Sequence, residues 1–207
     1  MQEGMSSQEL KERLTLIETM IAEGRRRTES WGWIFVLWGF AYFVAIGLAT
    51  GGRELSVWGN RHEGAWPITM LVACVLTLII GIRKGKGQPV TTVSRAVLAA
   101  WISAGVSMFF LCPALAAEGR LDQHTFVALV AAMLGMANGA SGIILRWKSQ
   151  FACAVIWWIT SVAACFGSIA QLTVVFLAAI FLCQIVFGFY TMVLEARRRR
   201  HTGVVHA

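Results

Sequence analysis

The sequence predicts an all-α fold: an integral membrane helical bundle with six transmembrane helices preceded by a cytoplasmic amphipathic helix. Of the 207 residues, 57% are hydrophobic and 14% are charged, whereas a soluble domain carries about 25% charged residues. The apolar residues form blocks of about twenty, the length that a helix needs to cross a bilayer. Lysine and arginine gather in short clusters beside these blocks, as in the loops of membrane proteins.

The first segment, residues 1–30, predicts a cytoplasmic amphipathic helix followed by a basic flank. Ser6 and Glu9 have the spacing of a capping box. Residues 7–24 carry one apolar stripe at steps of four, three and four, made by Leu10, Leu14, Ile17 and Ile21. The sequence through residue 24 holds five acidic and two basic residues, and a helix that lies on anionic lipid has the opposite balance. We therefore expect the stripe to pack on protein, either the chain's own cytoplasmic loops or a partner helix.

Six apolar segments follow within a membrane domain, residues 31–195. We place the spans at about 31–50, 66–82, 96–117, 124–145, 151–168 and 172–194. Residues 151–194 contain no charged side chain. Because this stretch is longer than one crossing requires, we expect two crossings joined by a turn near Ser168–Gln171. Residues 196–207 are expected to form a basic cytoplasmic tail.

Charge asymmetry between alternate loops predicts the orientation. Fifteen of the 18 Lys and Arg residues lie on the side of both termini, and three lie on the other side. The positive-inside rule assigns the richer side to the cytoplasm, so we expect a multi-pass protein of a bacterial inner membrane with both termini cytoplasmic. The basic residues expected to set this topology or to contact the head groups of membrane lipids are Arg25, Arg26, Arg27, Arg83, Lys84, Arg197, Arg198, Arg199 and Arg200.

The predicted spans lack the side chains that usually carry intramembrane chemistry. None contains Asp, Glu, Lys or Arg, which mark ion and proton pathways. The sequence has no H-E-x-x-H motif, and its five cysteines lie in apolar blocks without C-x-x-C spacing. We therefore expect no enzymatic activity, no catalytic residue, no cofactor and no metal site. Nucleic acid is not an expected partner, because the basic residues that give the net charge of +7 flank the spans.

Small and amide residues in the later spans are candidates for helix packing or for lining a cavity. Gly135 and Gly139 have G-x-x-x-G spacing, which lets helix backbones approach closely. Asn138, Ser141 and Gln184 are polar groups that must find a partner inside a membrane. Internal packing of one bundle and homodimerisation both agree with this pattern.

Two segments near the N-terminus, Leu16–Ile21 and Trp31–Gly39, resemble the opening of uncharacterised bacterial polytopic membrane proteins of about 200 residues. The resemblance covers about the first fifty residues. It implies an N-terminal amphipathic helix ahead of several membrane spans. It carries no activity, cofactor or catalytic residue with it.

These features favour a non-enzymatic membrane protein, a scaffold or regulatory subunit that binds a partner through its cytoplasmic helix. The alternative is a small transporter or channel for an uncharged or lipophilic solute, formed by a dimer. A wet cavity lined by Asn138, Ser141, Thr160 and Gln184 would favour the transporter. Tight packing around these residues would favour the scaffold.

Overall fold

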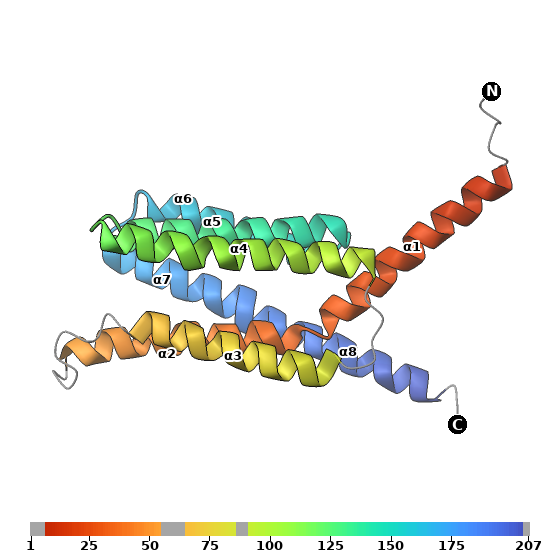
Figure 1. The fold of residues 1–207 in the computed structure, drawn as a ribbon, viewed down its shortest axis with the longest axis horizontal. Helices are drawn as coiled ribbons and strands as arrows, with labels where there is room; N and C mark the ends of the chain where they lie inside the picture. Colours follow the sequence, from red (N-terminus) through yellow and green to blue (C-terminus); the bar gives the residue numbers. More distant parts are fainter. Residues whose placement is uncertain (1–6, 55–64, 86–90, 205–207) are drawn as a thin grey trace. The chain divides into compact units, whose positions relative to one another are not determined.

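The computed structural model describes residues 7–54, 65–85 and 91–204, and its regular structure in these ranges is entirely helical (Figure 1). The elements are α1 (Ser7–Glu29), α2 (Gly32–Glu54), α3 (Ala65–Gly85), α4 (Thr92–Ala117), α5 (Gln123–Ile144), α6 (Lys148–Ala164), α7 (Ile169–Ile180), a π-helix η2 (Phe181–Val186) and α8 (Phe187–Val204). Five helical stretches are long and apolar enough to cross a membrane: Gly32–Ala49, Trp66–Arg83, Thr92–Ala117, Gln123–Ile144 and Ile169–Arg200.

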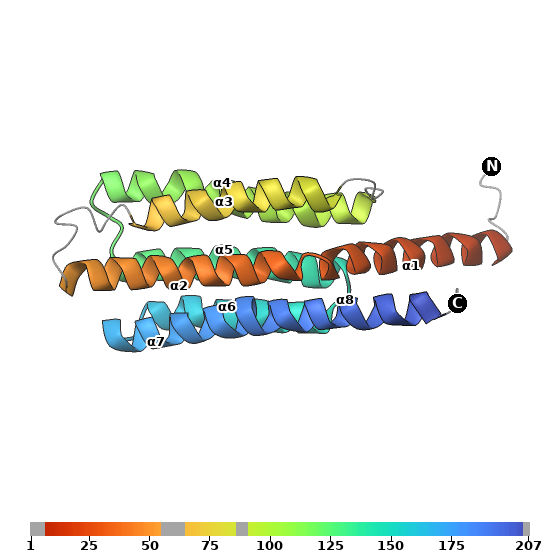
Figure 2. The ribbon, with the colours of Figure 1, turned by 90° about the horizontal axis from the view of Figure 1, so that it is seen from below.

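The chain forms two compact units, and the first comprises residues 1–29 and 90–161. It contains α1, α4, α5 and most of α6, with α4 packed on α5 and α1 in contact with α4. Thr91 and Asp122 begin α4 and α5 as N-cap residues, because their side chains accept hydrogen bonds from the Ser94 and Thr125 backbone N–H groups. Figures 1 and 2 both show the N-terminal part of α1 extending beyond the other helices of this unit.

The second unit comprises residues 30–89 and 162–207. Here α2 packs against α3, η2 and α8. The elements α7, η2 and α8 form one continuous helical rod, visible in Figure 2. Tyr42 of α2 is buried among Trp38, Trp66 and Phe176, with ring centroids 6.0–6.4 Å apart. This aromatic cluster joins α2 to α3 and α7.

The predicted turn at Ser168–Gln171 lies too far along the chain. The turn occupies residues 165–167, and Ser168 and Gln171 form a capping box at the start of α7. The polarity that indicated a turn therefore belongs to a helix cap, because these side chains satisfy the first free backbone groups of the helix. The expected basic tail also differs, because α8 continues through Arg197–Arg200 to Val204.

Other predicted boundaries shift by a few residues. The helix expected at 7–24 continues to Glu29, and the span expected from residue 96 begins at Thr92 after its Thr91 cap. The expected fifth span is α6, which has 17 residues and is therefore about 25 Å long at 1.5 Å per residue. This length places α6 outside the five membrane-crossing candidates.

Candidate partner face and polar clusters

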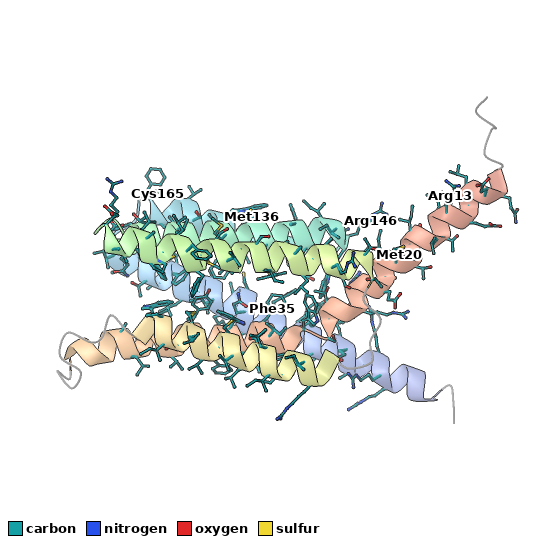
Figure 3. The ribbon with its side chains drawn as sticks, viewed as in Figure 1. Arg13, Met20, Phe35, Met136, Arg146 and Cys165 are labelled. Atoms are coloured by element: carbon teal, nitrogen blue, oxygen red, sulfur yellow. The ribbon has the colours of Figure 1, made fainter. Side chains whose placement is uncertain are left out.

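The apolar stripe of α1 is the candidate partner face, defined as Leu10, Leu14, Ile17 and Ile21. The side chains of Leu10, Leu14 and Ile17 are 48%, 52% and 52% exposed, and Ile21 is half-buried. Figure 3 labels Arg13, which lies between Leu10 and Leu14 in the sequence, on the part of α1 that extends beyond α4, α5 and α6. Isolated exposed leucines are common on protein surfaces, but a stripe that follows one helix face for three turns provides an apolar binding surface.

The charged residues beside this stripe leave it open. Arg13 Nη2 lies 2.8 Å from Glu9 Oε1 in an exposed i,i+4 ion pair, with the acidic residue first as the helix dipole favours. Thr15 and Thr19 donate their hydroxyl groups to backbone carbonyls one turn earlier. These polar groups are therefore satisfied within α1 and do not cover the leucines.

The C-terminal end of α1 is packed, in contrast to the candidate partner face. A Cβ atom built on Gly24 would lie 2.6 Å from Val93 Cγ1 and 3.4 Å from Leu145 Cδ2, so glycine allows α1 to approach the start of α4 and the end of α5. Thr28 is fully buried, and its hydroxyl donates to the Gly24 carbonyl oxygen over 3.0 Å. This end of α1 is therefore an integral part of the first unit.

A buried charge lies at this packed end. Glu29 is 1% exposed, and its Oε1 lies 3.3 Å from Arg25 Nε. The Arg25 guanidinium carbon lies 5.3 Å from the centroid of the Trp147 ring, which is a cation–π contact. Arg25 was predicted as a topology or head-group residue, but in this structure its side chain contacts protein. Glu29 was not among the predicted residues, although its i,i+4 spacing from Arg25 could have indicated the pair.

Two more polar residues, Ser149 and Gln150 at the start of α6, were not predicted from the sequence. Gln150 is fully buried, and neither amide atom has a hydrogen-bond partner among the residues described; the same holds for Ser149 Oγ. Gln150 lies in the first turn of α6, three residues after Trp147, which directly precedes the helix. Nothing in the local sequence pattern distinguished this glutamine from an exposed one at a helix start.

The small-residue face of α5 is filled from within the chain. Cβ atoms built on Gly135 and Gly139 would lie 2.4 Å and 2.9 Å from atoms of the Trp158 indole. A Cβ on Gly142 would lie 2.8 Å from the Phe151 backbone nitrogen. The G-x-x-x-G pair therefore forms a groove for a side chain of α6, and this face packs inside the first unit.

The polar residues predicted in the first unit form hydrogen bonds within their own helices. Asn138 and Ser141 are fully buried and donate to the carbonyl oxygens of Leu134 and Ala137 over 2.9 and 2.7 Å. Ser141 Oγ also accepts a 3.0 Å hydrogen bond from Trp101 Nε1, which links α5 to α4. Thr160 is buried and donates to Ile156, one turn earlier in α6. The Asn138 Oδ1 atom has no partner among the described residues.

Gln184 belongs to the second unit and lies within the π-helix η2. It is buried, and its Cβ would lie 2.9 Å from a Cβ built on Gly39. Glycine at position 39 therefore allows α2 to approach η2 closely. The residues named as a candidate cavity lining are divided between the two units, with Asn138, Ser141 and Thr160 in the first.

The remaining predicted basic residues are on the surface wherever their side chains are described. Arg26, Arg83 and Arg197–Arg200 are exposed, and Arg199 pairs with Glu195 one turn earlier in α8. The side chains of Arg27 and Lys84 lie outside the described part of the structure.

Groups that could hold a metal or perform redox chemistry are not assembled in the described structure. All five cysteines are free thiols. The described residues contain no group of three or more His, Cys, Asp or Glu side chains placed to hold a metal ion. The most clearly perturbed group outside the helical spans is Asp122, whose pKa is lowered by hydrogen bonds from the Thr125 side chain and backbone N–H.

No protein-family model matches the chain, and no curated protein or solved structure shows significant similarity to it. We therefore base the functional proposal on the contacts described above.

Proposed function

We propose that this chain is a non-enzymatic membrane protein, a scaffold or regulatory subunit that binds a protein partner through the candidate partner face of α1. The observation that carries the proposal is the exposure of Leu10, Leu14 and Ile17, each close to half exposed, toward the N-terminal end of α1. Burying these side chains against a partner would remove apolar area from water, which favours association. The acidic balance of this segment disfavours anionic lipid as the cover.

The packing around the later helices supports the scaffold over a transporter. Asn138, Ser141 and Thr160 are buried and direct their donors to carbonyl groups of their own helices. A solute pathway needs such groups to face the solute. Trp158 fills the small-residue groove of α5, which also supports internal packing there.

For the topology, we propose six crossings of a bacterial inner membrane with both termini in the cytoplasm. The support is the distribution of Lys and Arg, fifteen on one side and three on the other. The helix α6 is short but falls at the lower limit for a crossing. Single cysteines at Arg13 and Arg198, probed with an impermeant thiol reagent, test this directly. Labelling from the same side requires an even number of crossings, and labelling from opposite sides would contradict six.

Affinity isolation from native membranes in mild detergent tests the partner proposal. A variant with Leu10→Ser, Leu14→Ser and Ile17→Ser is compared with the intact chain and with Leu16→Ser. Leu16 is 61% exposed but lies off the stripe, so it is a matched control. We expect a protein that co-isolates with the intact chain and the control and is lost from the triple variant. Retention by the triple variant would contradict the proposal, as would solute flux in vesicles with no partner.

A further inference from the structure

The candidate partner face has the register of a two-stranded coiled coil. Steps of four, three and four residues place Leu10 and Ile17 at heptad position d, and Leu14 and Ile21 at position a. At the next position d, Gly24 is packed against Val93, so the open stripe ends where α1 joins the first unit. The available surface is therefore about two heptads long.

The charges beside the stripe are complementary in a parallel arrangement. In this register Arg13 occupies position g and Glu18 occupies position e. In a parallel coiled coil, residue g of one helix faces residue e five positions later on the other helix, so Arg13 faces Glu18 of the partner subunit twice by symmetry. In an antiparallel pair, g faces g and e faces e, so Glu18 would face Lys11 and Arg13 would have no carboxylate partner.

The side chains of α1 leave this pairing available. Glu18 forms no ion pair with any residue that the structure describes, because the residues three and four positions away are Leu14, Thr15, Ile21 and Ala22. Arg13 uses one terminal nitrogen for Glu9 and is 61% exposed. A guanidinium has five N–H donors, so it can bind a second carboxylate.

Membrane insertion favours contact between copies. Two copies inserted with the same topology carry α1 on the same side of the membrane, and the parallel pair is the arrangement in which Arg13 meets Glu18. Confinement to one bilayer also raises the effective concentration of one α1 helix near another. This compensates for a coiled coil that is too short to be stable between free peptides.

We propose that α1 pairs with α1 of a second copy of this chain as a parallel two-stranded coiled coil, with Leu10, Leu14 and Ile17 in its core and Arg13 facing Glu18 of the partner subunit. This inference rests on the proposed function and names the partner that the face binds. The G-x-x-x-G face of α5 is filled by Trp158, so the small-residue face does not compete with α1 for this role. The exposed stripe of α1 lies outside the five helical stretches that are apolar enough to cross a membrane.

Cysteine cross-linking in inside-out vesicles tests the geometry. Leu14→Cys lies in the predicted core, and Leu16→Cys is the matched control, because both leucines are exposed and only Leu14 is on the stripe. With a short, water-soluble bismaleimide we expect Leu14→Cys to give a covalent dimer at least five times more abundant than that from Leu16→Cys. The unsubstituted chain gives the background from the native cysteines. Equal dimer yields from both variants would overturn the coiled coil.

Charge exchange tests the register independently of folding. In the variant Arg13→Glu, positions 13 and 18 both carry carboxylates. In the variant Glu18→Arg, both positions carry guanidinium groups. When differently tagged chains are coexpressed, we expect the two variants to co-isolate several-fold better with each other than either does with itself. The double variant should associate with itself like the natural chain. Positions 13 and 18 are five residues apart and are not neighbours on one helix, so this rescue reports contact between chains. Equal recovery of all pairs would overturn the proposal.

A photoreactive residue in place of Leu14 distinguishes self-association from binding of a different protein. A cross-linked product of twice the chain mass supports self-association. A product with only a different protein would overturn the coiled coil and leave the partner face in place. The absence of any product would contradict both.

Discussion

The two ends of α1 differ in what surrounds them, although they belong to one continuous helix. Toward the N-terminus, Leu10, Leu14 and Ile17 are about half exposed. Toward the C-terminus, Thr28 and Glu29 are buried, and Gly24 closely approaches Val93. The difference shows that hydrophobicity does not decide which end is packed: the leucines are open and the glutamate is covered. One end is packed into the first unit, and the other leaves an apolar stripe exposed.

The largest effect should come from the buried ion pair. Arg25→Ala removes the guanidinium beside Glu29, whose carboxylate is 1% exposed. Breaking a buried pair costs about 3–5 kcal/mol, and because Arg25 is about one-third exposed we expect a loss of about 2 kcal/mol or slightly more in the free energy of unfolding. Guanidinium unfolding in mild detergent measures it. Arg26→Ala, with its exposed side chain, is the matched control and should change little.

An effect of similar size is expected at the close approach of α1 to α4. Gly24→Leu forces its side chain against Val93 and Leu145, and overpacking of this kind costs about 1–3 kcal/mol. Gly105→Leu in α4 provides the comparison, because a Cβ there meets nothing within 4 Å. If both variants unfolded at the same denaturant concentration, the C-terminal end of α1 would not be packed on this unit.

Asp122 is exposed, but we expect its carboxylate to stabilise the fold. Its carboxylate accepts a 2.8 Å hydrogen bond from the Thr125 N–H, and its pKa lies below the ordinary 3.8. A lowered pKa means that the group stabilises the fold at higher pH and loses this contribution as the pH falls below 4 toward the folded-state value. We expect Asp122→Asn, which still caps the helix, to lose less thermal stability than the natural chain between pH 6 and pH 3. An identical loss in both would contradict this role.

The smallest stability effect is expected on the candidate partner face. Leu14→Ala and Leu16→Ala should each change the free energy of unfolding by less than about 0.5 kcal/mol when no partner is present, as exposed positions usually do. Only Leu14→Ala should reduce the co-isolation of differently tagged copies of the chain. A destabilisation of about 2 kcal/mol or more by Leu14→Ala alone would mean that the stripe packs within its own unit, and the contrast between the two ends of α1 would disappear.

The sequence by itself determined the helical fold class and the approximate position of most helices. Blocks of about twenty apolar residues, as in Thr92–Ala117 and Gln123–Ile144, form helices because their backbone groups must be satisfied within the segment in a membrane. The Glu9–Arg13 pair was also predictable, since it depends only on helical spacing. The short α6 and the capping box at Ser168 were not, because apolarity alone does not set helix ends.

Only the tertiary structure decided which residues meet. It put Trp158 into the groove formed by Gly135 and Gly139, and it buried Glu29 beside Arg25 while leaving the leucines of the same helix open. Local patterns could not select these outcomes, because a small-residue face or a charged residue near a helix end agrees with several neighbours. The choice among them depends on the crossing of helices distant in the sequence, where side-chain shape and the burial of charge act together.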